Sequence, residues 1–502
     1  MSLKSFIAKL MAQYYAGKVA RWRSNPLEFQ DRVFEHNLSV GRTTLYGKDH
    51  GFDKVKNYED FKKAVPIQEY EGFKDYIERI KAGEKNVLWK GLPKYFAKTS
   101  GTTSGVKFIP VSEEGMPTFI SAGRIAFAMY THETGNASWV DGGLIFIQGS
   151  PELNKVGAVQ AGRMSGITYH HIPKYLRRNL TPTYETNTIE DWELKVDRIC
   201  DETLQRDMSV IGGIPPWVLM YFERLMEKTG KKSVSEIFPN FKVYPYGGVN
   251  FAPYREQFQK AIGKDIAYVE MYNASEGFIA FQDKQNVEGM LLNLDGGIFY
   301  EFVPADEIHD ENPTRLSLRE VELGVNYAII LNTNSGLWGY LIGDTVKFVS
   351  KDPYRIIVTG RTKHFISAFG EHVITEEVDE ALLTVAHEAG VGILEFHVAP
   401  QVNPPDGSLP YHEWFVEFSH EPQDMKSFAE KVNVLLCEKN IYYRDLIEGN
   451  MLQPLLIRSI PKDGFRQYMK ARGRLGGQNK MPRLANTREY ADDLVEVLEL
   501  KY

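Results

Sequence analysis

The sequence is poor in cysteine and has no excess of basic residues. Cys200 and Cys437 are the only two cysteines in a chain of 502 residues, which excludes a disulfide framework and a cysteine-rich zinc site. So few thiols are typical of the reducing cytoplasm, where we expect the protein to be located. With 59 basic and 66 acidic residues the net charge is −7, so we expect no nucleic-acid partner.

Long apolar runs are also missing. No stretch approaches the roughly 18 uncharged apolar residues of a membrane-spanning helix, and we expect no membrane partner. The first 26 residues contain five basic residues and no acidic one, a composition that an organelle transit peptide can share. Apolar residues nevertheless recur there at helical spacing, which favours an amphipathic helix docked on the domain: Leu3, Phe6, Ile7, Leu10, Met11 and Tyr14.

Enough apolar residues are present for a sizeable core, because 43% of the chain is hydrophobic and 12% is aromatic. Helical patterning dominates as far as Lys94, most clearly at 58–64 and 70–81. Beyond it, a predicted helix at 190–205 alternates with short apolar runs that predict strands at 144–148, 210–212, 240–246 and 266–271. This alternation predicts an α/β layer fold with functional loops at the strand ends.

The pattern changes after Leu291. A β-rich stretch predicts an antiparallel addition with strands at 297–304, 326–332, 339–342, 345–349 and 354–359. From Gly360 the pattern predicts a compact α+β module, with helices at 376–389 and 423–439 and strands at 392–398, 412–418 and 453–460. We therefore predict an α/β protein with mixed α+β elements, divided into a large domain at 1–360 and a small one at 361–502.

The sharpest local motif is Thr99-Ser-Gly-Thr-Thr-Ser-Gly-Val-Lys107. Its glycines allow backbone N–H groups to point outward, its hydroxyls add donors, and Lys107 supplies a positive charge, so the loop suits a polyphosphate. It is not a Walker loop, which places Lys-Ser/Thr directly after the second glycine. A solvated linker is the plainer alternative, since Gly/Ser/Thr clusters are usually loops.

Three later segments carry polar side chains at strand ends or at the domain boundary. Tyr272-Asn-Ala-Ser-Glu276-Gly follows a predicted strand, Gly339-Tyr-Leu-Ile-Gly-Asp344 ends another, and Gly360-Arg361-Thr-Lys-His lies at the boundary. A carboxylate such as Asp344 can accept two hydrogen bonds from the vicinal diol of a ribose. Each segment alone has a simpler explanation, because these charged residues also suit a helix cap, a turn or a solvated face.

In this order the segments resemble the adenylate-forming superfamily of acyl-CoA synthetases, nonribosomal peptide adenylation domains and luciferases. Within it the sequence is most similar to the auxin-responsive acyl-acid–amido synthetases of plants and their bacterial relatives. Ordered matches run from about residue 95 to 483, and the likeness rests on phrases at 107–110, 299–304, 323–327, 335–344 and 478–483.

The resemblance implies a role for each matching position. The ATP phosphates would be held by Ser100, Gly101, Thr102, Thr103 and Lys107. Adenine would be approached by Gly247 and Gly248 and stacked near Tyr272, and Asn273 and Ser275 would complete the nucleotide site. Glu276 would bind Mg²⁺, Asp344 would take the ribose hydroxyls and Arg361 would assist there. Lys480 would reach from a mobile small domain into the cleft during adenylation, and Lys363 lies near the hinge position.

Three departures from the family pattern mark the chain as a divergent member. Ala274 replaces a serine of the family's Tyr-x-Ser-Ser-Glu motif, and Leu341 replaces the arginine before the ribose-binding acid. One residue separates Gly105 from Lys107 where two are expected. The magnesium carboxylate, the ribose acid and the closing lysine are all retained.

The resemblance implies an ATP- and Mg²⁺-dependent ligase that joins a small carboxylic acid to an amino acid. A carboxylate is a poor electrophile, and attack on the α-phosphorus of ATP converts it into an acyl-adenylate that an amine can then open. Two alternatives stay open: transfer of the same acyl group to coenzyme A, and a non-catalytic acyl- or nucleotide-binding protein. We expect a monomer or a weak dimer.

Overall fold

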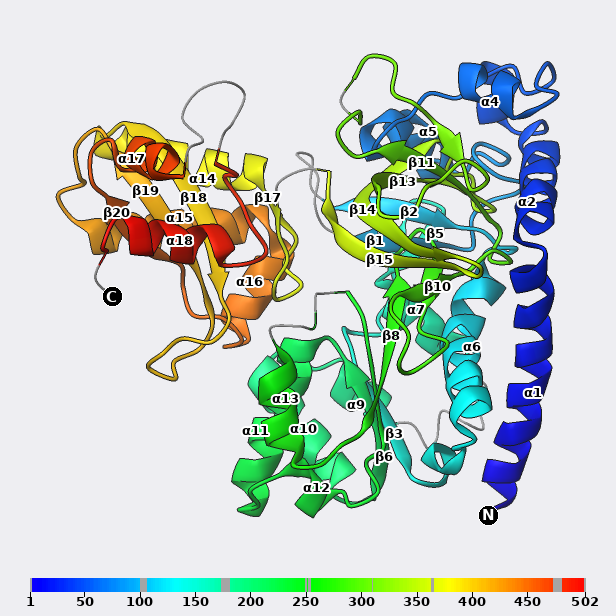
Figure 1. Cartoon of the computed structure of the whole chain (residues 1–502), viewed down its shortest axis with the longest axis horizontal. Coiled ribbons are helices and arrows are strands. Elements are labelled where there is room, and N and C mark those ends of the chain that lie inside the picture. The colour runs from blue at the N-terminus through cyan, green and yellow to red at the C-terminus, as the bar shows by residue number, and fades with distance from the viewer. Residues whose placement is uncertain are drawn as a thin grey trace.

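The computed structural model describes residues 2–99, 106–172, 181–248, 251, 254–308, 310–362, 365–472 and 481–500. Two bodies lie next to each other (Figure 1). We call the described residues up to Thr362 the large unit and those from Phe365 onward the small unit. That the chain consists of two independent domains divided at residue 360 stays a prediction.

An eleven-stranded sheet forms the centre of the large unit, in the order β12-β11-β13-β14-β15-β10-β9-β8-β7-β6-β3. Four neighbouring strands at one end are parallel: β3 (Gly143–Ile147), β6 (Met208–Gly213), β7 (Val243–Tyr246) and β8 (Ala267–Asn273). The others pair antiparallel: β9 (Phe278–Phe281), β10 (Met290–Leu292), β11 (Ile298–Pro304), β12 (Leu316–Ser317), β13 (Asn326–Thr333), β14 (Tyr340–Lys351) and β15 (Tyr354–Arg361). The predicted β-rich addition therefore continues the α/β sheet, and the two strands expected at 339–349 are one strand.

Helices cover the parallel half of the sheet on both sides (Figure 1). On one side lie α9 (Tyr184–Asn187), α10 (Trp192–Thr203), α11 (Pro215–Thr229), α12 (Val234–Ile237) and α13 (Arg255–Ile262). On the other, α6 (Met116–Thr134) contacts β8 and β9 and is followed by η2 (Ser138–Asp141). The helix predicted at 190–205 and the strands predicted before it and after it are confirmed.

A second, four-stranded sheet has the order β2-β1-β5-β4. It consists of β1 (Tyr95–Thr99), β2 (Lys107–Val111), β4 (Asn154–Val156) and β5 (Val159–Gly162), with α7 (Met164–His170) beside it. The helices before it are α2 (Pro26–Gly41), α3 (Leu45–Asp49), α4 (Tyr58–Ala64), η1 (Tyr70–Phe73) and α5 (Lys74–Lys81). The helical character predicted up to Lys94 is therefore confirmed, with α4 at its predicted bounds.

The N-terminal helix α1 (Leu3–Ser24) forms as predicted, but the prediction of its docked face was wrong. Ser5, Ala12, Val19 and Trp22 are its buried residues, and the helix packs along α6. The six apolar residues expected to dock are 45–74% exposed. Small side chains at a seven-residue spacing allow the close approach to α6, a signal that hydrophobicity alone does not give.

The small unit is a three-stranded sheet with helices, as predicted. Its sheet consists of β18 (Ile393–Gln401), β19 (Tyr411–Phe418) and β20 (Leu456–Ile460). A short hairpin of β16 (Phe365–Ile366) and β17 (Val373–Ile374) precedes them. The helices are α14 (Thr375–Ala389), α15 (Met425–Lys439), α16 (Ile441–Glu448), α17 (Gly464–Ala471) and α18 (Glu489–Val497), of which the sequence predicted α14 and α15.

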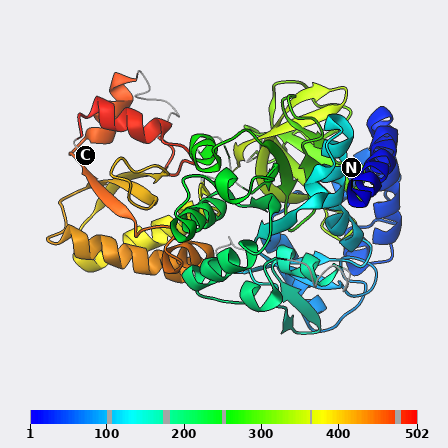
Figure 2. The same cartoon turned by 90° about the horizontal axis from the view of Figure 1, so that it is seen from below.

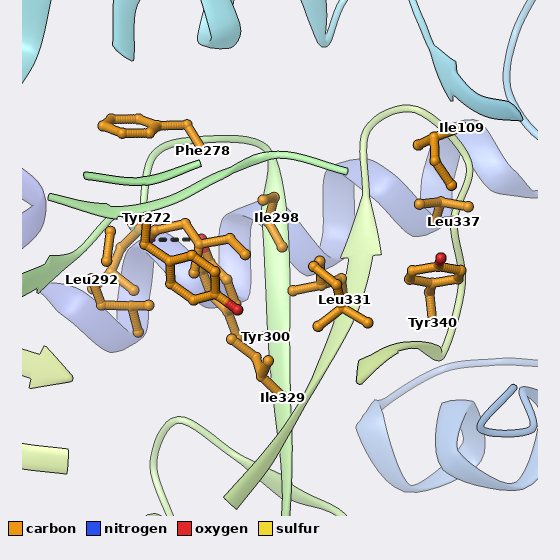
Figure 3. Close-up of a cluster of buried hydrophobic side chains, with 14 of the residues drawn as sticks. Ile109, Tyr272, Phe278, Leu292, Ile298, Tyr300, Ile329, Leu331, Leu337 and Tyr340 are labelled. Atoms are coloured by element: carbon orange, nitrogen blue, oxygen red, sulfur yellow. Dashed lines mark hydrogen bonds between the residues drawn. The ribbon is translucent and has the colours of Figure 1, made fainter. Parts of the chain in front are cut away.

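The core of the large unit follows the sheet from its antiparallel end to β8. Figure 3 shows Tyr272, Tyr300 and Tyr340 packed among apolar side chains of β11 and β13 such as Ile298 and Leu331. Figure 2 shows the small unit and α1 at opposite ends of the molecule. Within the described residues, no helix is long and apolar enough to cross a bilayer.

Candidate active site

Two of the predicted motifs meet at the carboxyl edge of the parallel strands. Gly247 directly follows β7, and the segment after Tyr272 ends the adjacent strand β8. Because parallel strands present their carboxyl ends on one edge, this position is where ligands bind in open α/β sheets. The segment 274–277 closes a tight hairpin into β9, in which the Ala274 N–H donates to the Gly277 carbonyl at 2.9 Å.

Glycine is required at both positions after β7. A Cβ on Gly247 would lie 2.2 Å from the carbonyl oxygen of Met271, so any larger residue would clash with the backbone of β8. Gly248 has a φ of +85°, a conformation that glycine adopts without steric cost. These glycines let the chain turn close to β8 and leave no side chain between the backbone and a ligand at the sheet edge.

Asp344 is the centre of the first group of polar side chains. It lies on β14 opposite Arg361 on β15, and the Arg361 Nε is 2.8 Å from its Oδ1. The Tyr272 hydroxyl donates to its Oδ2 at 2.6 Å. Burial and the neighbouring Asp344 raise the pKa of Tyr272 well above its ordinary value, so the phenol remains a donor. Each carboxylate oxygen keeps a lone pair for a further hydrogen bond.

Glu276 is the centre of the second group. Burial raises its pKa, whereas the Lys107 ammonium and a hydrogen bond from Tyr340 favour the ionised form. Burial in turn lowers the pKa of Lys107, and Glu276 opposes that shift. The two charges therefore support each other at a site that is partly removed from water.

Lys107 is positioned by the hairpin of β1 and β2, where it pairs with Thr99. The Phe108 N–H donates to the Tyr70 hydroxyl at 2.9 Å, which ties the start of β2 to η1. Four predicted phosphate-binding residues lie outside the described residues: Ser100, Gly101, Thr102 and Thr103. Of the remaining positions in the β8 motif, Asn273 is exposed and Ser275 is half-buried.

The predicted hinge residue Lys363 and the predicted closing residue Lys480 also lie outside the described residues. The chain after Lys480 packs on the small unit. Met481 is buried against Ala399 and Phe415, and the Pro482 carbonyl lies 2.6 Å from the Nδ1 of His397.

Sequence reasoning gave no role to two residues that the structure brings to this site. Tyr340 lies four positions before Asp344 on β14, and the alternation of side chains along a strand is the signal that could have found it. His372 lies between β16 and β17 in the small unit. Burial, Arg361 and Lys107 lower its pKa to about 3.

The loop that carries His372 is held by its own contacts. The Ser367 Oγ is 2.8 Å from the His372 Nδ1, and the Asn440 side-chain amide donates to the His372 carbonyl at 3.3 Å. Glu371 accepts from the Phe369 N–H and pairs with His412, in both cases at 2.8 Å. Because the Tyr254 hydroxyl of the large unit donates to the Ala368 carbonyl at 2.5 Å, the loop also joins the two units.

These side chains lie at the carboxyl ends of strands in an α/β sheet, and comparison with known families identifies the class of protein. Three models match the chain: the GH3 family N-terminal domain at residues 16–195, the GH3 family central domain at 291–361 and the GH3 family C-terminal domain at 376–489. Together they cover well over half of the sequence. The chain belongs to the GH3 family, and the resemblance to acyl-acid–amido synthetases is confirmed.

Named relatives are ligases of this family. A jasmonoyl–L-amino acid synthetase of Nicotiana attenuata is 23% identical over 64% of this chain and 66% of its own length. An indole-3-acetic acid-amido synthetase of Arabidopsis thaliana is 22% identical over 90% of this chain and 88% of its own. A solved acyl acid amido synthetase in complex with 2,4-DB has a TM-score of 0.62 at 16% identity, covering 97% of this chain and 96% of its own; it supports the fold.

Proposed function

We propose that this protein uses ATP to adenylate a small carboxylic acid and then transfers the acyl group to the amine of an amino acid. The observation that carries the proposal is the convergence of Lys107, from the four-stranded sheet, with Glu276, Asp344 and Arg361, from the eleven-stranded sheet, in a chain of the GH3 family. A simple nucleotide-binding protein does not need a half-buried carboxylate and ammonium beside its ribose site. The cytoplasmic location and the monomeric or weakly dimeric state belong to the same proposal.

Asp344 is the group we assign to the ribose. Tyr272 and Arg361 each hold one of its oxygens, so the remaining lone pairs of the carboxylate have fixed directions. The glycines after β7 leave room for the adenine. Tyr272 is 9% exposed and its hydroxyl is used by Asp344, so its contribution here is to orient Asp344 as well as to border the base.

Glu276 is the group we assign to Mg²⁺, and its surroundings fit that role. A partly buried carboxylate whose pKa is raised by burial gains from a cation. Mg²⁺ is commonly bound by one or two carboxylates together with the phosphates of the nucleotide. When bound, the ion would reduce the charge on those phosphates. Tyr340 holds the Glu276 carboxylate in place, and Lys107 would contact a phosphate oxygen.

The reaction then needs no nucleophile from the protein. The substrate carboxylate attacks the α-phosphorus and pyrophosphate leaves, which forms the acyl-adenylate. The amine attacks the acyl carbon, loses a proton and expels AMP. Negative charge develops on phosphate oxygens in the first step, so preorganised cations and N–H donors supply most of the stabilisation. Lys480 is the cation we assign to that step.

The test is an acid-dependent ATP–pyrophosphate exchange assay over a panel of carboxylic acids, followed by an amino acid panel on each acid that reacts. We expect Glu276→Gln to reduce exchange by about 100-fold, because it removes a charged contact to the reacting phosphates. Glu223→Gln is the matched control, since burial also raises the pKa of Glu223 but this residue lies on α11.

Three results would overturn parts of the proposal. If coenzyme A accelerates AMP release and no amino acid does, the enzyme is an acyl-CoA synthetase. If no acid supports exchange, the protein does not adenylate. If Glu276→Gln keeps full exchange, the metal assignment is wrong.

A further inference from the structure

Helix α1 packs on the protein with one face and carries large apolar side chains on the opposite face. One face carries Ser5, Ala12 and Val19, which are at most 3% exposed and lie against the protein. The Ser5 hydroxyl also donates to Asp141 at 2.7 Å, which fixes this face to η2. The helix is therefore attached to the large unit without any help from its other face.

The other face presents six large apolar side chains to solvent. They recur at helical spacing over the first half of α1, and their exposed fractions run from 45% to 74%: Leu3, Phe6, Ile7, Leu10, Met11 and Tyr14. We call this set the α1 stripe. Both views place α1 at the outer edge of the molecule, at the end away from the small unit (Figures 1 and 2). A continuous exposed apolar surface of this kind marks an interaction site.

Basic side chains surround the α1 stripe. Lys4 precedes Ile7 by three residues and Lys9 follows Phe6 by three, and residues at that spacing are neighbours on a helix. The Lys18 Nζ lies 4.7 Å from the centre of the Tyr14 ring. No acidic residue occurs in the chain before Glu28, whereas the whole protein is acidic.

We infer that α1 docks this protein on an anionic lipid surface, with the α1 stripe inserted among the lipids and its lysines at the headgroups. Apolar side chains on one face with Lys and Arg beside them are the pattern of helices that lie in the plane of a membrane interface, and anionic headgroups attract such lysines. A second copy of this chain fits less well, because a symmetric contact would bring two helices of five positive charges and no negative one together. This inference revises the expectation that the protein has no membrane partner.

The experiment is co-sedimentation of the full-length protein with vesicles of phosphatidylcholine alone and of phosphatidylcholine with 30% phosphatidylserine. We expect binding to be at least about tenfold stronger on the anionic vesicles and to weaken with salt. The double variant Phe6→Ser/Leu10→Ser should lose that binding. Leu383→Ser/Val434→Ser is the matched control, because these side chains are 50% and 55% exposed on the small unit.

Charge is tested separately with Lys4→Glu/Lys18→Glu, which should bind anionic vesicles at least about tenfold more weakly. Its control, Lys231→Glu/Lys232→Glu, makes the same charge change at exposed lysines after α11. Circular dichroism and acid-dependent pyrophosphate exchange should be unchanged in all four variants, since none touches the active site. Absence of binding to anionic vesicles would overturn the inference. So would a concentration-dependent dimer, detected by sedimentation velocity, that Phe6→Ser/Leu10→Ser abolishes.

Discussion

At the scale of single residues, the structure shows how the hydroxyl of a core tyrosine can orient a carboxylate. Tyr272 is buried among apolar side chains, yet its hydroxyl reaches Asp344 at 2.6 Å. Arg361 holds the other oxygen of the same carboxylate at 2.8 Å. Two donors from two different strands therefore fix the orientation of the acid that we assign to the ribose.

This arrangement predicts a graded effect on adenylation. Asp344→Asn should lower acid-dependent pyrophosphate exchange by about 100-fold or more, because it removes a charged contact to the nucleotide. Tyr272→Phe removes only the hydrogen bond that orients Asp344, and we expect a loss of about tenfold. Tyr300→Phe is the control, since it removes a hydroxyl from the same core that donates to the Asn293 carbonyl. An equal loss in Tyr272→Phe and Tyr300→Phe would contradict the orienting role.

His372 gives a prediction about pH. Its pKa of about 3 in the folded protein lies below the ordinary value of 6.5, so between these values the unfolded chain binds a proton that the folded chain does not. The contribution of His372 to the free energy of unfolding is therefore complete above pH 6.5 and is lost as the pH falls toward 3. The loss is at most about 1.4 kcal/mol per pH unit. His372→Gln should therefore flatten the pH dependence of the urea midpoint between pH 4 and 6.5.

The control for this measurement is His387→Gln, which changes an exposed histidine on α14. If His372→Gln and the wild type show the same slope with pH, the imidazole is not held neutral by its surroundings. The glutamine side chain in His372→Gln can still accept a hydrogen bond from the Ser367 hydroxyl. If the variant has a lower urea midpoint than the wild type by the same amount at every pH, the loss comes from packing and not from titration.

The residues of the site were partly predictable from the sequence, and the reason differs from residue to residue. Asp344, Arg361 and Glu276 belong to linear motifs whose order carries the family resemblance, and it is this resemblance that implies a common site. Tyr340 and His372 do not belong to such motifs. The position of Tyr340 depends on the alternation of side chains along β14, and that of His372 depends on how a loop of the small unit packs. Short-range patterns carry no information on such long-range contacts.

At the scale of elements, a buried ion pair joins β15 to the segment after β9. The Arg355 guanidinium contacts both oxygens of Asp283, at 2.6 and 2.9 Å, and the two side chains are 3% and 0% exposed. Removing one partner of a buried pair leaves an uncompensated charge and typically costs about 3–5 kcal/mol. We expect Asp283→Asn to lower the free energy of unfolding by an amount in this range, measured by urea denaturation.

The exposed pair between Arg79 and Glu84 provides the comparison. It has the same bidentate geometry, with distances of 2.6 and 2.8 Å, but water screens its charges. Glu84→Gln should leave the urea midpoint almost unchanged. Similar losses in the two variants would mean that burial does not determine the strength of these pairs.

Elements were predicted well where periodicity and turn residues agree. The strands at β8, β11 and β13 and the helices α4, α14 and α15 were expected within a few residues of their observed bounds. The face on which α1 docks was predicted wrongly. Ser5 and Ala12 are buried through close helix packing, while larger apolar residues face outward. Periodicity identifies an apolar face, but only the packing of the whole fold decides what covers it.

At the scale of the whole molecule, polar contacts and a shared hydrophobic cluster join the two units. Arg163 of the large unit lies 2.7 Å from Asp445 of the small unit, and Asn450 donates to Glu193 at the same distance. The Tyr254 hydroxyl also donates to the Ala368 carbonyl across the two units. Buried apolar side chains of both units, among them Tyr254 and Phe369, belong to one hydrophobic cluster, so a change in the position of the small unit would have to rearrange apolar as well as polar contacts.

Lys480 separates those two steps. Met481, the residue after it, packs on the small unit, so the lysine belongs to the part of the chain that we expect to change position. A cation reduces the repulsion between the substrate carboxylate and the α-phosphate as they approach, but it does little for attack by a neutral amine on the finished adenylate. Lys480→Ala should therefore abolish most acid-dependent pyrophosphate exchange, while amide formation from a supplied acyl-adenylate persists.

The matched control for that variant is Lys470→Ala, which removes an exposed lysine from α17 of the same unit. It should leave both reactions unchanged. Equal losses of exchange and amide formation in Lys480→Ala would mean that the lysine serves both steps or supports folding, and circular dichroism distinguishes these. Full exchange activity in Lys480→Ala would remove the lysine from the adenylation step, and the phosphate charge would then have to be balanced by Lys107 and Arg361 of the large unit alone.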